Sequence, residues 1–403
     1  MNPNEQVNMR ILFIAAPAIG HVFPMVPLAW AFRAAGHDVT FITAGDGVAI
    51  ARAGLPVFDA LPGRTTPDML AGFVRDVPEL FAPVRGRPID EMNKRKPLAI
   101  AAWDPYVDAH VTLAERVRPE MVVYDPIFGG VGLLVAAMLE IPAVAHGLSI
   151  ARYTPELLRD LPAAVAFRRY GLEVPEGIET IDVAPPSLAE SPPSDLQMRY
   201  VPYNAGGVLP EWLLTIPERP RIAVTFGTLR KTRGFGYAER IVAAAPDVDA
   251  EFVVCLGDEE ASVFGELPPN VRTTGWIPLN ALLRTCSAAI HHGGGTSLTC
   301  CALGIPQMTV PEGSPDLLAE AELLRARGAA HVVHAHELDS AAIGGLLTDD
   351  KLRSVAGEIQ AEIAALPAPS DLVPRLIGHA EQDHLARKSI LKGADRWRHA
   401  TAG

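Results

Sequence analysis

The stretch "MRILFIAAPAIGHVFPMVPLAWAFRAAGHDVTFIT", Met9–Thr43, decides the fold class. It begins with an unbroken apolar run, which is typical of a strand buried on both faces of a parallel sheet. After a turn at Gly20 and His21, apolar residues recur at helical spacing as far as Gly36, and a second apolar run follows. This strand-helix-strand order predicts a doubly wound α/β sheet, whose ligands bind at the carboxyl ends of the strands.

The same alternation recurs along the rest of the chain. "MVVYD" (121–125), "GVGLLVAAMLE" (130–140) and "PAVAHG" (142–147) repeat it in the first half. After a region rich in Pro and Gly, a second series reads "RIAVTFGT" (221–228), "AEFVVCLG" (250–257), "AAIHH" (288–292) and "PQMTVP" (306–311). A chain of 403 residues is also too long for one ordinary core. We therefore expect two Rossmann-like domains facing each other across a cleft.

The Pro and Gly content sets the expected domain limits. We predict an N-terminal domain over residues 1–205, a linker over 206–220 and a C-terminal domain over 221–375. The charged end of the chain, 376–403, is expected to form a helix that packs on either domain, with a crossing back to the N-terminal one as one arrangement.

The composition excludes several classes of protein. The formal net charge of -12 argues against nucleic acid as a partner, because phosphate backbones select clustered Lys and Arg. The four cysteines show no CxxC pair and predict free thiols. The first apolar run is too short for a membrane span and opens a strand, so we expect a cytoplasmic protein. The oligomeric state, including a homodimer, stays open.

His21 and Asp125 are the candidates for acid-base chemistry. The turn after the first strand is not G-x-G-x-x-G, which disfavours a hydride-transfer enzyme. His21 offers an imidazole that titrates near neutral pH, and Asp125, at the end of another buried strand, could orient it. The alternatives are a helix-capping His21, a turn-forming Asp125, and Asp104 as a competing carboxylate of lower rank.

Two glycine turns in the second half predict an anion site. Gly227 and Thr228 end one strand, and "GGGTS" (293–297) ends another and begins a helix. Glycine lets the backbone approach an anion, hydroxyls donate to it, and the helix N-terminus adds its dipole. A single glycine turn of this kind more often has a structural role than an anion-binding one. A metal site at His291 and His292 is disfavoured, because adjacent strand residues point to opposite faces.

Together, "GHVFPMVPLAWAFRAAGHDVTF", "TFGT", "TTGWIPLNALL" and "IHHGGGTSLTCCALGIPQMTVPEGSPD" resemble the nucleotide-sugar-dependent family 1 glycosyltransferases, especially bacterial members that decorate macrolides, aromatic polyketides or enediynes. The resemblance implies a GT-B fold, with the acceptor on the N-terminal domain and the donor on the C-terminal one. It also implies inverting, metal-independent transfer, with no cofactor besides the nucleotide-sugar.

The resemblance assigns roles to single residues. His21 matches the general base, Asp125 its orienting carboxylate, and Trp276 the aromatic that stacks on the donor base, with the Ile277 backbone at the base edge. The remaining candidate donor contacts are Gly20, Gly227, Thr228, His291, His292, Gly294, Gly295, Thr296, Asp316 and Leu317.

Three departures from the family pattern refine these assignments. Three glycines precede Thr296, one residue fewer than usual; counting back without gaps from "GIPQ" favours His291 as the phosphate-binding histidine, and a deletion after Gly294 would make it His292. Plant uridine-diphosphate users carry a Glu eight positions after that histidine to hold both ribose hydroxyls. Thr299 stands there, which favours a thymidine diphosphate (TDP) donor.

The third departure concerns the sugar. The family's Asp-Gln pair becomes Asp316 and Leu317, and the loss of an amide predicts a deoxysugar or otherwise modified hexose. The expected acceptor is a hydrophobic natural product in antibiotic biosynthesis, and its pocket is expected within 56–105 and 146–167, where Phe73, Phe81 and Trp103 line it or simply pack. The rival functions are a nucleotide-sugar epimerase of the same fold and a non-catalytic helper of a partner glycosyltransferase.

Overall fold

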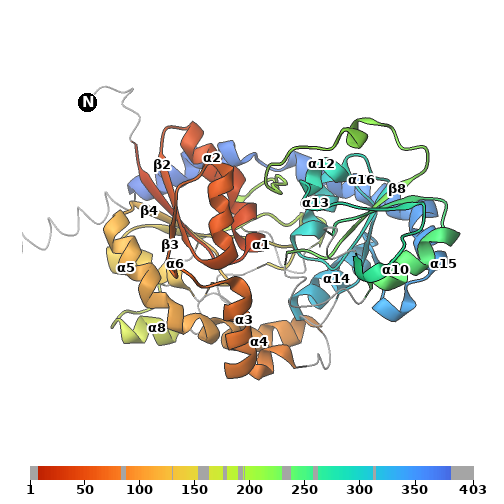
Figure 1. The fold of residues 1–403 in the computed structure, drawn as a ribbon. Coiled ribbons are helices and arrows are strands. Elements are labelled where there is room, and N and C mark those ends of the chain that lie inside the picture. The colour runs from red at the N-terminus through yellow and green to blue at the C-terminus, as the bar shows by residue number, and fades with distance from the viewer. Residues whose placement is uncertain are drawn as a thin grey trace, which may run out of the picture.

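The computed structural model describes residues 8–82, 88–128, 130–152, 163–175, 179–188, 194, 196–228, 237–256, 262–311 and 315–382. It contains two α/β domains side by side, the first coloured red to yellow and the second green to blue in Figure 1. The chain leaves the first sheet after β7 and enters the second at β8 (Arg221–Thr225), with the short 3-10 helix η6 (Glu211–Leu214) between them. These element bounds are compatible with the predicted domain limits at 205 and 220, which stay a prediction.

Each domain is built on a sheet whose described strand pairs are all parallel. In spatial order the first sheet contains β3 (Val57–Asp59), β2 (Asp38–Thr43), β1 (Arg10–Ile14), β4 (Met121–Tyr124), β5 (Ala143–His146), β6 (Glu179–Asp182) and β7 (Leu196–Gln197). In spatial order the second sheet contains β10 (Val271–Thr273), β9 (Glu251–Val254), β8, β11 (Ala288–His291), β12 (Gln307–Thr309) and β13 (His331–Val332).

Helices cover both faces of these sheets (Figure 1). In the first domain they are α1 (Ile19–Val22), α2 (Val26–Ala34), α3 (Thr66–Asp76), α4 (Pro88–Trp103), α5 (Val107–Val117), α6 (Val131–Leu139) and α8 (Ala163–Arg169). In the second they are α10 (Ala238–Ala244), α12 (Leu279–Leu283), α13 (Gly295–Leu303), α14 (Pro315–Arg327), α15 (Ser340–Thr348) and α16 (Asp350–Ala365). The other 3-10 helices are η1 (Phe23–Met25), η2 (Gly45–Ala53), η3 (Pro78–Phe81), η4 (Asp104–Tyr106), η5 (Pro186–Leu188), η7 (Ala245–Asp247), η8 (Ser262–Phe264) and η9 (Ala335–Glu337).

Strand alternation explains why β1 is apolar from Ile11 to Ile14. Ile11 and Phe13 face the core that packs against α2, whereas Leu12 and Ile14 face the core against α5 and α6. Successive strand side chains point to opposite faces, so a strand covered on both sides needs apolar residues at every position. In the second sheet, neighbouring residues of β8 divide between two clusters in the same way.

The expected doubly wound α/β architecture is confirmed, and the predicted strands at Met9, His37, Met121 and Arg221 correspond to β1, β2, β4 and β8. One local difference concerns the predicted Gly-His turn. Residues Ile19–Val22 instead form the one-turn helix α1, which directs the side chain of His21.

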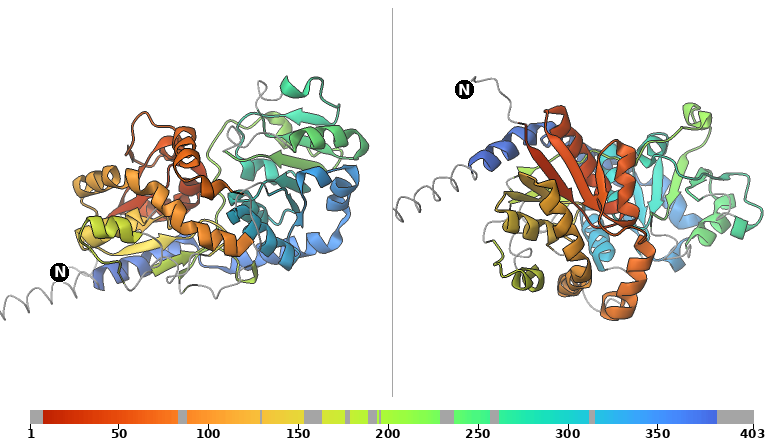
Figure 2. Two further views of the ribbon diagram at one scale, coloured as in Figure 1. Left: turned by 90° about the horizontal axis from the view of Figure 1, so that it is seen from below. Right: turned by 60° about the vertical axis from the view of Figure 1, so that its left-hand side comes forward.

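The described end of the chain packs on the N-terminal domain. A helix at 369–382 contributes Leu372 and Leu376 to the same core as Ile11 and Phe13. His379 on this helix forms an ion pair of 2.8 Å with Glu179 of β6. Figure 2 shows this blue helix beside the N-terminal domain. The expected helix beyond residue 382 lies outside the described residues.

The structure also bears on the cysteines and on membrane-spanning helices. None of the four cysteines, all within the described ranges, forms a disulfide. In the part of the chain that the structure describes, no helix has the length and apolar content needed to cross a bilayer.

Gly132 offers a test of the packing that places Asp125. A Cβ at Gly132 would lie 2.1 Å from Cβ of Tyr124, the last residue of β4. We expect Gly132→Ala to lower the free energy of unfolding by about 1 to 3 kcal/mol, because α6 must move off the sheet. Gly72→Ala, on α3 with only the Arg75 guanidinium 4.0 Å away, should instead stabilise by up to about 1 kcal/mol. Denaturant unfolding of both variants measures the difference, and equal effects would contradict this packing argument.

Candidate active site

A cavity of about 300 Å³ lies between the two domains. It is lined by residues that follow the carboxyl ends of strands in both sheets, as expected for doubly wound domains. Of the residues singled out in the sequence, those that line it are Gly20, His21, Gly227, Thr228, Trp276, Ile277, His292, Gly294, Gly295, Thr296, Asp316 and Leu317. Asp125 lies directly behind His21, and His291 is not among the lining residues.

His21 and Asp125 form a hydrogen-bonded pair. Nδ1 of His21 lies 2.7 Å from Oδ2 of Asp125, whose side chain is fully buried. The backbone N–H of Ala16 donates to the same oxygen at 3.1 Å, and that of Ile127 donates to Oδ1 at 2.8 Å. These contacts fix the carboxylate, and a bond from Nδ1–H leaves Nε2 as the basic nitrogen. The His21 side chain keeps 28% of its surface exposed, so the ring is accessible from the cavity.

The environment of His21 raises its pKa. Burial alone lowers the pKa of the imidazole, because it disfavours the charged form. The charge and hydrogen bond of Asp125, with a smaller contribution from Asp316, more than offset this and bring the pKa above its ordinary value of 6.5. An imidazole with this partner can accept a proton and hold it as imidazolium, which is what a general base requires.

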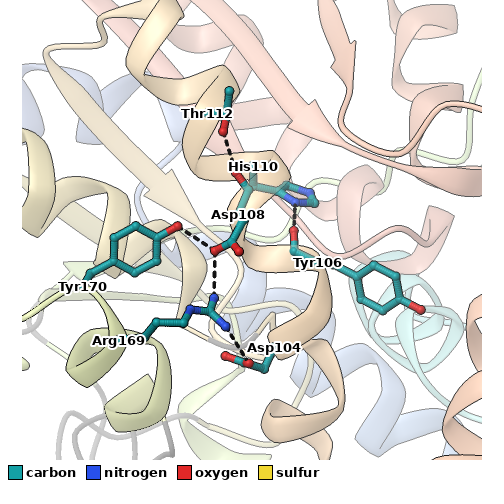
Figure 3. Close-up of polar contacts among 7 residues, drawn as sticks. All are labelled: Asp104, Tyr106, Asp108, His110, Thr112, Arg169 and Tyr170. Atoms are coloured by element: carbon teal, nitrogen blue, oxygen red, sulfur yellow. Dashed lines mark hydrogen bonds and ion pairs between the residues drawn. The ribbon is translucent and has the colours of Figure 1, made fainter.

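The competing carboxylate, Asp104, forms an ion pair with Arg169. Figure 3 shows Arg169 of α8 between Asp104 and Asp108, at 2.8 Å from each. Tyr170 donates a further hydrogen bond of 2.6 Å to Asp108. Asp104 therefore ties α8 to the start of α5 and does not orient His21.

The predicted anion cradle contains two glycine turns that face each other. Gly227 has φ +69°, and a Cβ there would lie 2.3 Å from Cε1 of His292, so only glycine fits beside this ring. Gly294 has φ +70° and precedes α13, whose first residues are Gly295 and Thr296. Backbone N–H groups in the first turn of a helix have no intrahelical acceptor and favour an anion.

The structure places His292, and not the preferred His291, at the wall of the cavity. His291 is the last residue of β11 and is fully buried, with Nε2 3.0 Å from Oε1 of Gln307. Its Nδ1 accepts the N–H of Gly293 at 3.0 Å. Both ring nitrogens are thus engaged in the interior, whereas His292 points to the opposite face and lines the cavity. Of the two histidines, His292 is the one that faces the two glycine turns.

This placement moves the position at which a ribose-binding Glu would stand. Eight residues after His292 is Cys300 instead of Thr299. Both side chains are buried and neither lines the cavity, and the Thr299 hydroxyl donates to the carbonyl of Gly295 at 2.8 Å. Neither position supplies a carboxylate, so the basis of the donor prediction is unchanged.

Trp276 stands at the boundary between the domains. It lies in the loop between β10 and α12, and 52% of its surface is exposed. Its ring meets Phe23 of the N-terminal domain edge to face, with centroids 6.5 Å apart, and Phe23 meets Tyr203 at 5.0 Å. An exposed aromatic face at the cavity wall can stack on a planar base.

Asp316 and Leu317 both line the cavity but differ in environment. Asp316 is exposed at the start of α14, whereas Leu317 is buried and packs on the glycine turn, where a Cβ at Gly293 would lie 3.2 Å from it. Across the described residues, no three His, Cys, Asp or Glu side chains gather as a metal-binding group would.

The aromatic residues expected in the acceptor pocket pack against one another. Phe73 meets Trp103 edge to face at 4.6 Å, and Trp103 meets Phe128 at 5.1 Å; none of them lines the cavity. The side chain of Phe81 lies outside the described residues. Among the described residues of the two expected segments, those that line the cavity are Leu148, Ser149 and Ala151.

Sequence reasoning missed Glu320, which lines the cavity beneath the glycine turn. A charged residue inside an amphipathic helix normally faces solvent, so the sequence did not indicate that Glu320 belongs to the site. The signal was its spacing: Glu320 follows Asp316 by four residues, which puts both on one face of α14.

Comparison with known proteins adds independent findings. Family models for the N- and C-terminal domains described as "Erythromycin biosynthesis protein CIII-like" match residues 30–227 and 239–378. The elloramycin glycosyltransferase ElmGT of Streptomyces olivaceus is 36% identical over 375 residues, which cover 91% of this chain and 97% of ElmGT.

Two solved structures are also similar over most of the chain. The glycosyltransferase SnogD from Streptomyces nogalater is 35% identical with a TM-score of 0.78, covering 93% of this chain and 100% of SnogD. The glycosyltransferase SsfS6 from Streptomyces sp. SF2575, solved in complex with thymidine diphosphate, is 30% identical with a TM-score of 0.75 and the same coverage.

The pair of His21 and Asp125 makes a testable prediction about proton affinity. We expect Asp125→Asn to lower the pKa of the His21 ring, because burial then acts without its main counter-charge. Nuclear magnetic resonance titration of the histidine ring protons, with His21→Ala to assign the signal, measures this. His37, which lies beside Asp38, serves as the control and should titrate unchanged. An unaltered His21 titration in Asp125→Asn would show that the carboxylate does not set its pKa.

Proposed function

The chain belongs to the family of erythromycin biosynthesis protein CIII-like glycosyltransferases, and from that premise we propose that it transfers a sugar from a TDP-sugar to a hydroxyl of a hydrophobic natural-product aglycone in antibiotic biosynthesis. The fold is the GT-B fold of its structural neighbours, and the chain is a glycosyltransferase enzyme. The observation that carries the assignment of the reacting groups is the Asp125-bound imidazole of His21 at the wall of the cavity.

In the proposed reaction, Nε2 of His21 takes the proton of the acceptor hydroxyl. The acceptor oxygen attacks the anomeric carbon while the bond from that carbon to the diphosphate breaks, so the anomeric configuration inverts in one displacement. Asp125 stabilises the imidazolium that results. The diphosphate leaves with its charge facing the first turn of α13 and His292, which is the support for transfer without a metal or other cofactor.

The proposed donor carries thymidine diphosphate. SsfS6, a similar glycosyltransferase, was solved with this nucleotide. In this chain, Thr299 and Cys300 are buried residues where a ribose-binding carboxylate would stand. The proposed sugar is a deoxy or otherwise modified hexose. Its support is Leu317, which presents an apolar side chain beside Asp316 and leaves a hydroxyl there without a hydrogen-bonding amide.

The proposed acceptor is a hydrophobic aglycone. The N-terminal wall of the cavity is formed mainly by apolar groups, namely Ala18, Ile19, Phe23, Pro24, Ile127, Leu148 and Ala151. Burying an apolar molecule against such a wall is favourable, and Ser149 adds one polar group for orientation.

The base assignment is tested by His21→Ala. We expect kcat with a TDP-deoxysugar and a phenolic or alcoholic polyketide aglycone to fall about 10²- to 10⁴-fold, because proton removal is lost. The Kd for TDP should stay near that of the wild type, and His336→Ala, an exposed histidine outside the cavity, should keep full activity. Wild-type turnover in His21→Ala would refute the assignment.

The donor site is tested by replacing each of the two adjacent histidines separately with alanine. We expect His292→Ala to raise the Kd for TDP about tenfold or more, because a contact with a charged group is lost, with little change in stability. His291→Ala should instead destabilise the fold by about 2 to 4 kcal/mol, since it removes two buried hydrogen bonds. Calorimetric titration and thermal unfolding separate the two effects. Tighter binding of uridine diphosphate than of TDP by the wild type would overturn the donor proposal.

A further inference from the structure

Glu320 is a buried carboxyl at the floor of the diphosphate cradle. It lies on α14, only 3% of its surface is exposed, and it lines the cavity. Its Oε2 accepts the N–H of Gly294 at 3.2 Å. The N–H of the preceding glycine is held by His291, so these two side chains fix the turn from below. The N–H of Gly294 is therefore directed at Glu320.

The second oxygen of Glu320 identifies the protonation state that the site favours. Oε1 is buried without a hydrogen-bond partner, and so is Oγ of Ser297 on the neighbouring helix α13. An ionised carboxylate would be a buried charge with no positive group beside it, and only the Gly294 N–H and the Ser297 hydroxyl would offset that cost. A neutral carboxyl presents an O–H donor, and a hydroxyl such as that of Ser297 can accept from it.

The groups around Glu320 act on its pKa in opposite directions, and burial has the largest effect. Burial raises its pKa to about 8, the Ser297 hydroxyl lowers it, Asp316 raises it, and the Gly294 N–H lowers it; none of these groups carries a positive charge. The other titratable groups that face it are Tyr200, from the segment after β7, and Cys301 of α13. Burial holds both in their neutral forms by raising the pKa of each to about 12.

We propose that Glu320 is a positioning residue whose neutral form supports the diphosphate of the donor, so that the nucleotide binds together with one proton. The reason is electrostatic: an ionised Glu320 would place a negative charge directly beneath the turn that receives an anion. The bound diphosphate in turn makes ionisation of Glu320 more costly, so nucleotide and proton stabilise each other's binding. The carboxyl also holds the N–H of Gly294 and keeps the turn in the shape that precedes α13. This inference rests on the proposed function, because it assumes that the anion is the donor diphosphate.

Glu320→Gln tests the inference, because an amide imitates the neutral carboxyl in both shape and hydrogen bonding. Calorimetric titration with TDP should give a wild-type Kd about tenfold weaker at pH 9 than at pH 7, since a group with a pKa of about 8 loses most of its proton in this range. Glu320→Gln should match the wild type at pH 7 and lose most of this pH dependence. His21 and His292 are present in both proteins, so their titration cancels in the comparison.

Two further measurements separate this role from a merely structural one. Titrations in buffers of different ionisation enthalpy should show uptake of nearly one proton per TDP bound by the wild type at pH 9, and almost none by Glu320→Gln. Glu322→Gln makes the same change of charge on the same helix at a residue that does not line the cavity, and should behave as the wild type.

The outcomes distinguish the inference from the function on which it rests. TDP binding at pH 7 with no proton uptake at pH 9, or with the same pH profile in Glu320→Gln, would overturn the role of Glu320 and leave the proposed donor intact. An absence of TDP binding at pH 7 would overturn the proposed donor, and the inference with it.

Discussion

Parallel pairing puts the carboxyl ends of all strands of a sheet on one edge, and both halves of the site depend on this constraint. Ile14 of β1 pairs with Tyr124 of β4, so the residues that follow them, Ala16 and Asp125, meet and hydrogen-bond. In the second sheet, Thr225 of β8 pairs with His291 of β11, and the following residues bring Gly227 against the ring of His292. The cavity exists because the two edges face each other.

The two buried carboxyls of the site are satisfied in different ways. Asp125 receives two backbone N–H groups and the imidazole of His21, which together supply what a carboxylate needs in the interior. Glu320 receives a single backbone N–H, and its other oxygen has no partner. The first arrangement suits a fixed negative charge that supports imidazolium, and the second suits a neutral group beneath an anion. Under the proposed mechanism, positive charge develops on His21 at one wall and negative charge on the leaving diphosphate at the other, so each carboxyl suits the charge that it faces.

The sequence predicted the elements whose patterns are strong. Runs rich in apolar residues predicted β1, β4, β8 and β11, since a strand covered on both faces buries nearly every side chain. It missed α1, because a single helical turn has too few residues to show a period. For the acceptor segments the sequence left two alternatives open for a related reason. Phe73 and Trp103 are apolar enough to line a pocket, but composition does not distinguish that from packing on each other.

The sequence by itself determined the doubly wound fold and the residue types at the strand ends, including His21, Asp125 and the glycines, because local periodicity and turn chemistry carry that information. Only the tertiary structure shows that His292 lines the cavity and His291 is buried, since the face to which a residue points depends on where β11 ends and on what covers the sheet. It also excluded Asp104 through its ion pair with Arg169 and brought Glu320 under the glycine turn. Such choices follow from contacts between segments that lie far apart in the sequence, for which neither hydrophobic periodicity nor motif spacing carries a signal.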